Sequence, residues 1–192
     1  MKLQIIYKLL FFIILLSSCS KESDVNFEKY ETITTAKEIS RFYGIPLDTT
    51  GNSESAKILK WIDGSFDFYY SYKLKESEKY KPMIYLAEIN KRNSINDAIE
   101  NFNNIKSQFI ILSDILTDSN LKEIDSLIPS NEQYYYAIRH FDNEPNGILF
   151  ALRKQNIVYS LIVSGFYTND HSMIKELILP KLQNLEKFNI KD

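Results

Sequence analysis

A stretch of alternating side chains between residues 56 and 74 constrains the fold of this chain more than any other feature. From Ser65 to Leu74, large apolar side chains occupy every second position, which is the two-residue period of a β-strand with one face turned inward. A shorter apolar run, Ala56 to Ile62, ends just before Asp63-Gly64, a dipeptide typical of tight hairpin turns. The two runs predict an antiparallel hairpin, because strands joined by so short a turn run in opposite directions.

Apolar runs farther along the chain predict the remaining elements of the domain. We expect further strands at 82–90, 134–141, 148–153 and 157–164, and helices at 35–43, 94–116, 120–128 and from 169 onward. The strands at 82–90 and 157–164 are apolar on both faces and should be central, whereas the strand at 65–74 has a polar face and should lie nearer an edge. The sequence therefore predicts an α+β domain with a six-stranded antiparallel sheet in βββα-βββα order.

The last third of the chain carries a resemblance to a known fold family. A tyrosine-rich strand is followed by Ile148-Leu149-Phe150-Ala151-Leu152, by the segment 156–161, and by a helix that ends in Leu182-Gln183-Asn184-Leu185. This ending is similar to that of the Mog1/PsbP-like α/β/α sandwich, although the closing Ser-Phe of that family is absent. Members of the family mostly bind partners or assist assembly. The resemblance therefore implies binding rather than catalysis, although a fold alone does not determine a function.

Residues 1–18 have the parts of a bacterial secretory signal. Lys2 and Lys8 form a short positive region, and residues 9–16 form an uninterrupted apolar run. A membrane-spanning helix needs about 20 apolar residues, so this run is too short to span and has the length of a cleaved signal peptide. The segment then ends in Leu16-Ser17-Ser18-Cys19, which resembles the lipobox of bacterial lipoproteins.

The lipobox resemblance implies a lipid anchor at Cys19. In lipoproteins the thiol of this cysteine receives a diacylglycerol, the signal is cut before it, and the new amino group is acylated. Cys19 is the only cysteine in the chain, which excludes a disulfide framework. It also argues against the alternative, a secreted protein whose cysteine lies near the cleavage site by chance. We therefore expect the membrane to be a partner through the lipid, because several acyl chains give stable attachment.

The residues after Cys19 predict a location in the cell envelope. Residues 20–24 resemble the surface-export signal of Bacteroidetes lipoproteins, with Ser23 interrupting the acidic pair, and a solvated linker is the alternative. We expect a lipidated tether at 19–33 and a single globular domain at 34–192. The protein is expected on the outer membrane, facing either the periplasm or the cell exterior.

Composition and motifs argue against most kinds of chemistry. The formal net charge of −2 does not provide the basic surface of a nucleic-acid binder. The sequence has no phosphate-binding glycine loop and no nucleophile elbow, and its two histidines and one cysteine cannot form an all-His/Cys zinc site. We therefore expect no nucleic-acid partner, no cofactor, no metal and no catalytic residue.

The few polar candidates for a chemical site each have a simpler interpretation. His140 is expected to be a partly buried, hydrogen-bonded strand residue, and His171 to lie in the solvated first turn of the last helix. Asp142 and Glu144 flank a turn that lacks the ligand pattern of a calcium loop. Three further carboxylates would meet only if their strands pair side by side, namely Asp63, Asp67 and Glu88.

Tyrosines are the most prominent candidates for binding. The run Tyr134-Tyr135-Tyr136 places rings on both faces of one strand, and Tyr69 lies on the polar face of another. Tyrosine is enriched at interfaces because it offers a large contact area, although strand tyrosines also fill cores. We expect these four residues to form a binding surface for a protein, a peptide or a glycan.

Hypotheses from different classes remain open at this point. The leading one is a membrane-anchored envelope lipoprotein with a non-enzymatic binding domain, and a toxin-neutralising lipoprotein of the immunity type would be one case of it. The second is an envelope hydrolase that uses Asp or Glu together with Tyr, which would require carboxylates with shifted pKa values in a pocket. The third is a structural subunit of an envelope complex.

Overall fold

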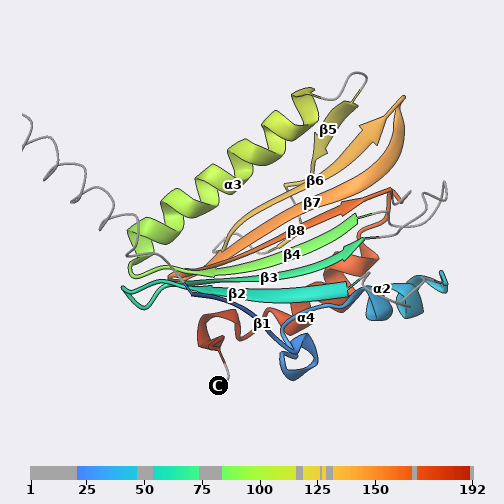
Figure 1. Ribbon diagram of the computed structural model, residues 1–192. Coiled ribbons are helices and arrows are strands. Elements are labelled where there is room, and N and C mark those ends of the chain that lie inside the picture. Colours follow the sequence, from blue (N-terminus) through green and yellow to red (C-terminus); the bar gives the residue numbers. More distant parts are fainter. Residues whose placement is uncertain are drawn as a thin grey trace, which may run out of the picture.

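The computed structural model describes residues 21–46, 54–73, 84–115, 119–125, 127–128, 132–165 and 168–190. In these residues the chain forms one eight-stranded antiparallel sheet with the strand order β1-β2-β3-β4-β8-β7-β6-β5 (Figure 1). The strands are β1 (Lys21–Asp24), β2 (Glu54–Lys60), β3 (Phe66–Lys73), β4 (Ile84–Lys91), β5 (Ser119–Glu123), β6 (Gln133–Phe141), β7 (Glu144–Lys154) and β8 (Ile157–Ser164).

Helical segments lie on both faces of the sheet. The long helix α3 (Ile95–Ile115) crosses one face, and the shorter segments lie on the other (Figure 1). These are the 3-10 turns η1 (Phe27–Lys29) and η3 (Leu185–Lys187), the helices α2 (Ala36–Tyr43) and α4 (Leu179–Lys181), and the π-helix η2 (Met173–Ile178).

Each face of the sheet has its own hydrophobic core. The larger core joins side chains of β2–β4 and β6–β8 to those of α2, η2 and η3, and Phe68, Tyr85 and Tyr159 are fully buried in it. The smaller core lies under α3, where Phe102 and Phe109 pack against the second half of the sheet. Among the strands, α3 contacts β5, β7 and β8. α3 therefore lies mainly over the second half of the sheet, and the face of β2–β4 on that side carries polar side chains, among them Asp67 and Glu88.

The predicted six-stranded sheet in βββα-βββα order is wrong, because two more strands join the sheet. β5 lies where a helix was expected at 120–128, and it pairs with β6 from Ser119 to Glu123. The apolar residues there do have helical spacing. In the structure, however, Leu121 packs into the smaller core from a strand. Hydrogen bonding to the edge of β6 outweighs the local preference for a helix. The second added strand is β1.

The predicted tether at 19–33 also needs correction. β1 pairs with β2 over its whole length, from Lys21 opposite Lys60 to Asp24 opposite Lys57. Farther along, Tyr30 and Ile33 are buried in the larger core. The folded domain therefore includes β1 and the residues that follow it up to Ile33. The polar residues of β1 are compatible with an edge strand, because the outer side of such a strand faces water.

Elements with strong local signals agree with the structure. Thr35 and Glu38 form a reciprocal capping box at the start of α2, and Gly44 ends the helix with a φ of 65°, a backbone conformation that suits glycine. At the start of α3, the Asp97 amide donates to Ser94 Oγ at 3.1 Å. The strands β4 and β8, expected to be central, pair with each other in the middle of the sheet.

Candidate functional site

The turn between β2 and β3 differs from the predicted two-residue hairpin. β2 ends at Lys60, so Trp61 and Ile62 lie in the turn and not in the strand. A two-residue turn of the type favoured in hairpins needs positive φ at both central residues, and here Gly64, with a φ of 87°, has it while Asp63 does not. The β6–β7 turn does have this geometry, with φ of 51° at Asp142 and 63° at Asn143. The Asp63-Gly64 signal therefore marks a wider turn.

Short hydrogen bonds hold this wider turn in one conformation. The amide of Trp61 donates to the carbonyl of Ser65 at 3.0 Å, and the amide of Gly64 donates to the carbonyl of Trp61 at 3.2 Å. The Asp63 carboxylate accepts from the amide and the hydroxyl of Ser65, at 2.9 and 2.6 Å, and these bonds lower the pKa of Asp63. The turn is thus closed by its own backbone and by an Asp side chain that hydrogen-bonds two residues ahead, a common turn device.

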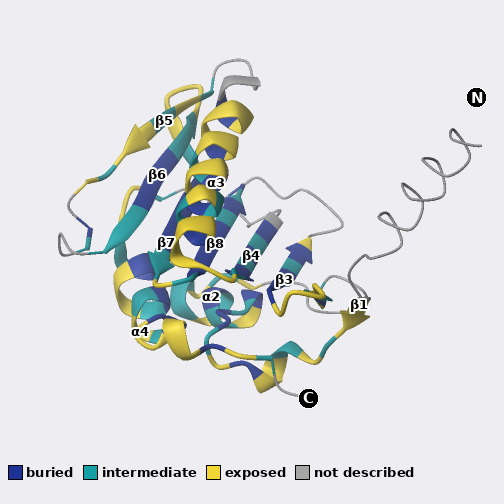
Figure 2. Ribbon diagram, turned by 90° about the vertical axis from the view of Figure 1, so that its left-hand side faces the viewer, coloured by how far each residue is buried: buried dark blue, intermediate teal, exposed yellow. Residues whose placement is uncertain are grey.

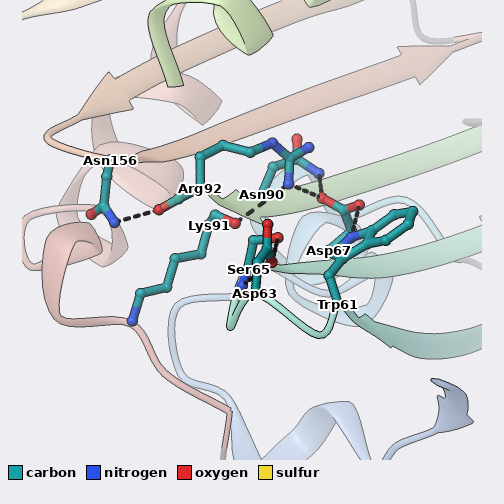
Figure 3. A network of polar contacts seen from close by, with 8 residues as sticks. All are labelled: Trp61, Asp63, Ser65, Asp67, Asn90, Lys91, Arg92 and Asn156. Atoms are coloured by element: carbon teal, nitrogen blue, oxygen red, sulfur yellow. Dashed lines mark hydrogen bonds and ion pairs between the residues drawn. The ribbon is translucent and has the colours of Figure 1, made fainter. Parts of the chain in front are cut away.

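A buried carboxylate connects this turn to the next strand. Asp67, in β3, is 5 % exposed and accepts hydrogen bonds at both of its oxygens (Figure 3). Its Oδ1 accepts from Asn90 Nδ2 at 2.7 Å and from Arg92 Nη1 at 2.6 Å, and its Oδ2 accepts from Trp61 Nε1 at 3.2 Å. A buried carboxylate requires such partners, because an unpaired one would be strongly destabilising. The indole of Trp61 is thereby tied to β4 through Asp67.

The same network reaches the turn between β7 and β8. The Arg92 amide donates to the carbonyl of Asn156 at 2.9 Å, and Asn156 Nδ2 donates back to the carbonyl of Arg92 at 2.6 Å (Figure 3). Three connections of the chain therefore meet at one end of the sheet. We call this end of the sheet the hairpin end. It is formed by the start of β1, the β2–β3 turn at 61–65, the β4–α3 connection and the β7–β8 turn.

Asp67 and Glu88, two carboxylates considered in the sequence, do approach each other. Tyr69 of β3 is directly opposite Glu88 of β4, and Asp67 is opposite Asn90, so both carboxylates lie on the face that α3 leaves open. Burial and the charge of Asp67 raise the pKa of Glu88, and burial with the charges of Asp67 and Glu88 raises the pKa of Tyr69 to about 12. Asp63, by contrast, belongs to the turn.

This arrangement is suited to holding structure more than to acid–base chemistry. A general acid or base must be able to exchange a proton with a substrate within hydrogen-bond reach. Three donors from neighbouring elements occupy Asp67, one of them a guanidinium. Glu88, the other carboxylate on this face, has a raised pKa, and none of its causes is a hydrogen bond.

The hairpin end also exposes apolar side chains that sequence analysis placed inside a strand. Ile62 is 81 % exposed and Trp61 is 39 % exposed. The signal that would have revealed them is the alternation itself, because two consecutive large apolar residues before Asp63-Gly64 do not fit a strand with one buried face. A separate set of exposed apolar residues lies at the opposite end of the sheet, where α3 and β6 end, and consists of Ile110, Ile111, Leu112 and Phe141.

The tyrosines expected to form a binding surface do not gather on one. Tyr135 is 4 % exposed and packs against Phe109 in the smaller core, whereas Tyr136 is 1 % exposed and lies in the larger core on the other face (Figure 2 shows the burial of each strand). The hydroxyl of Tyr134 donates to the carbonyl of Asp125. Tyr69 is half-buried beside Glu88, far along the sheet from β6. Aromatic rings on both faces of one strand were correctly expected, but they fill two cores.

His140 is a partly buried strand residue as expected, whereas the environment of His171 differs from the expected one. His171 is packed against Tyr136, whose hydroxyl lies 3.1 Å from His171 Nδ1, so it is not a freely solvated residue. His140 is partly buried at a bulge of β6, and its Nδ1 has no hydrogen-bond partner in the described part of the chain. In the described residues, no group of three or more His, Cys, Asp and Glu side chains could hold a metal ion.

A groove on the other face of the sheet contains an ion pair between Lys181 and Glu38. It has a volume of about 660 Å³ and is bordered by the start of α2 and by α4. Lys181 Nζ donates to both carboxylate oxygens of Glu38, at 2.6 and 2.8 Å, and Glu38 also caps α2. Burial alone would raise the pKa of Glu38, but the hydrogen bonds from Lys181 and Thr35 outweigh it and lower the pKa.

Comparison with known proteins identifies no relative. No family model matches the chain, and neither a curated protein nor a solved structure is significantly similar to it. The resemblances to bacterial lipoproteins and to the Mog1/PsbP-like family therefore stay predictions. The lipobox and Cys19 lie outside the described residues. Within those residues, no helix is both long and apolar enough to cross a membrane.

Proposed function

We propose that this protein is a bacterial envelope lipoprotein, anchored in the outer membrane through a lipid on Cys19, whose folded domain is a non-enzymatic binding module. The observation that carries the proposal is the position of β1. Its first residue, Lys21, comes two residues after Cys19 and is already paired with β2. The expected lipidation site is therefore only two residues along the sequence from the first strand of the folded domain.

This short spacing gives the anchor a definite consequence. Two residues span at most about 7 Å between Cα atoms, whatever their conformation. A lipid on Cys19 would thus hold the domain close to the membrane surface, without a long flexible linker between them. The hydrophobic run before Cys19 is too short to be the anchor itself, because a span needs about 20 apolar residues.

The polar network supports a binding module more than a hydrolase. The hydrolase alternative requires at least two carboxylates free to exchange protons in a pocket. Asp67, the more buried of the two carboxylates on the open face, is bound by Trp61, Asn90 and Arg92. Through these hydrogen bonds and those between Arg92 and Asn156, Asp67 connects three turns of the chain. A binding surface needs such a rigid scaffold beneath it.

Metabolic labelling with an alkyne fatty acid tests the anchor. Cells that produce the full-length chain are expected to yield labelled protein in the membrane fraction, and Cys19→Ser is expected to abolish the label and release the anchor. Ser23→Ala, a matched change within the same segment, should keep both. A wild-type chain without label would contradict the proposal.

Protease treatment of intact and lysed cells tests on which side of the outer membrane the domain lies. Loss of the protein from intact cells would place it outside, in agreement with the export resemblance of residues 20–24. Survival in intact cells, with loss after lysis, would place it in the periplasm and remove the surface-export hypothesis. Replacing Lys21 and Glu22 in the first case should return the domain to the periplasm.

A further inference from the structure

We propose that the tip of the β2–β3 turn, Trp61 with Ile62, enters the interfacial layer of the phospholipid bilayer that holds the lipid of Cys19. This inference rests on the proposed function, because it requires a lipid on Cys19. It adds an orientation that a lipid anchor alone does not give. The hairpin end would face the bilayer, and the opposite end of the sheet would point away from it.

The pairing of β1 brings the anchored end of the chain to this turn. Lys21, the first residue of β1, is opposite Lys60, the last residue of β2, and Trp61 follows directly. Neighbouring strands lie about 5 Å apart, Cys19 is two residues before Lys21, and Trp61 is one residue after Lys60, so the Cα atoms of Cys19 and Trp61 are at most about 17 Å apart. In Figure 1 the start of β1 and the β2–β3 turn share the left-hand end of the sheet. A bilayer that takes up the acyl chains of Cys19 therefore passes close to the tip.

The side chains at the tip suit the boundary between water and hydrocarbon. Ile62 is mostly exposed, Trp61 is partly exposed, and Ile95 at the start of α3 is a third exposed apolar residue at this end. Tryptophan favours the membrane interface because its ring is apolar with one polar edge, and an exposed isoleucine gains free energy when it leaves water. An outward carboxylate would oppose entry, but the Asp63 carboxylate turns back onto the amide and hydroxyl of Ser65.

Two lysines lie at the strand ends next to the tip. Lys60 ends β2 and is exposed, and Lys91 ends β4 with its Nζ 5.8 Å from the centre of the Phe66 ring. A lysine next to an interfacial tryptophan places its ammonium group among the headgroups, while its aliphatic stem stays in contact with apolar atoms. The ammonium groups of the two lysines would thus lie among the lipid headgroups, while Trp61 and Ile62 would lie deeper.

The tip is held in its exposed conformation before any contact with lipid. Asp67 fixes the indole of Trp61, and the turn is closed by the hydrogen bonds between Trp61, Gly64 and Ser65. Arg92 and Asn156 connect the same network to the sheet. A preorganised loop loses little conformational entropy on contact, so even two apolar side chains can contribute to membrane association.

The fluorescence of Trp61 provides a direct test, because it is the only tryptophan in the chain. The lipidated protein is reconstituted into vesicles of phosphatidylcholine and phosphatidylethanolamine that carry a doxyl quencher either near the headgroup or near the end of an acyl chain. We expect the shallow quencher to reduce the emission of Trp61 about twofold more than the deep one, as for a ring at the interface. The lipid on Cys19 is verified in the same samples by the mass of the N-terminal peptide.

Two matched variants localise the contact. Ile62→Asp places a charge at the tip and is expected to reduce quenching by the shallow label about threefold, because a carboxylate resists leaving water. Ile111→Asp makes the same change at an exposed site, 55 % accessible, at the opposite end of the sheet, and should leave the quenching unchanged.

Each other result overturns the inference in a distinguishable way. Lipid on Cys19 without quenching of Trp61 would overturn it and leave the proposed function standing. A reduction of Trp61 quenching by Ile111→Asp as large as that by Ile62→Asp would also overturn it, because the quenching would then not report contact at the tip. Shielding of Trp61 from a water-soluble quencher without quenching by lipid would show that a second copy of the chain covers the tip. A chain without lipid on Cys19 would overturn the proposed function together with this inference.

Discussion

The hairpin end and the opposite end of the sheet each withdraw a charged side chain from water, and they do so with different partners. At the hairpin end, Asp67 accepts from the guanidinium of Arg92 and from two neutral donors. At the opposite end, Arg139 donates to Asn146 Oδ1 at 3.0 Å and to Ser164 Oγ at 2.6 Å, both neutral, and burial lowers the pKa of Arg139. Removing Asp67 would leave the charge of Arg92 unpaired, which lowers stability. Removing Arg139 would also remove the cost of taking its charge out of water, so stability should fall less.

The two ends also expose apolar side chains for different reasons. Ile110, Ile111 and Leu112 are exposed because they lie beside the stripe of α3 that contains Phe102 and Phe109 and faces the sheet. Their exposure follows from the period of a helix. Ile62 is exposed because the width of the turn takes it out of β2. The comparison teaches that exposed apolar residues at the hairpin end are held by a specific turn geometry, whereas those at the opposite end are a by-product of helix register.

The largest effect on stability is expected from removing the centre of the hairpin-end network. Asp67→Ala leaves the donors of Trp61, Asn90 and Arg92 without their acceptor and should lower the free energy of unfolding by about 3 kcal/mol. Urea unfolding of the purified protein in detergent, followed by circular dichroism, measures this change. Trp61 emission should shift to longer wavelength in the folded variant. Asp67→Asn, which keeps the shape and an acceptor oxygen, should cost less, and a loss below about 1 kcal/mol for Asp67→Ala would remove the distinction between the two ends.

A smaller effect is expected at the opposite end. Arg139→Met removes two hydrogen bonds to neutral acceptors but also a charge that is costly to bury, so the free energy of unfolding should fall by about 1 kcal/mol. The same urea titration measures it, and the emission of Trp61 should stay as in the wild type. If Arg139→Met costs as much as Asp67→Ala, the nature of the partners does not decide the stability of a buried charge in this protein.

The smallest effect, and the only gain, is expected from Glu88→Gln beside Asp67. Burial and the charge of Asp67 raise the pKa of Glu88 above 4.5, so the folded state binds this proton more tightly than the unfolded state. The stabilisation from protonated Glu88 is full below pH 4.5 and is lost as pH rises through the raised pKa. At pH 7 the variant should therefore be more stable than the wild type by about 0.5 kcal/mol.

Comparing the urea midpoints at pH 4 and pH 7 separates this effect from a change in packing. The gain should appear at pH 7 and vanish at pH 4, where Glu88 is largely protonated in the wild type. It should also shrink in an Asp67→Ala background, because the neighbouring charge is then absent. A Glu88→Gln variant that unfolds more easily at pH 7 would contradict the assignment of Glu88 as a strained carboxylate.

Elements defined by signals within one turn or one strand were predictable from the sequence. The helix expected at 35–43 and the strand expected at 157–164 follow from local patterns, and the structure confirms both as α2 and β8. These signals work because the hydrogen bonds and side-chain period that they reflect connect residues a few positions apart.

Elements that depend on distant partners were missed or misassigned. β5 has a helical spacing of apolar residues, and only its pairing with β6 makes it a strand. β1 is a polar segment without strand character of its own, and its ladder to β2 connects residues more than 30 positions apart, such as Asp24 and Lys57. The Lys57 Nζ also forms an ion pair with Glu22 Oε1 at 2.5 Å. Tyr135 and Tyr136 were recognised as facing opposite ways, but whether a face is buried depends on the helix that covers it.

The sequence by itself determined which residues face together along each predicted strand, where the helices α2 and α3 lie, and, through the residues around Cys19, where a lipid is expected. Only the tertiary structure decided that Asp67 would meet Arg92, 25 positions away, and that the start of β1 would lie beside the turn that contains Trp61 and Ile62. The physical reason is that side-chain period is a property of a few consecutive residues. The pairing that brings the start of β1, the β2–β3 turn and the buried carboxylate to one end is a property of the whole sheet.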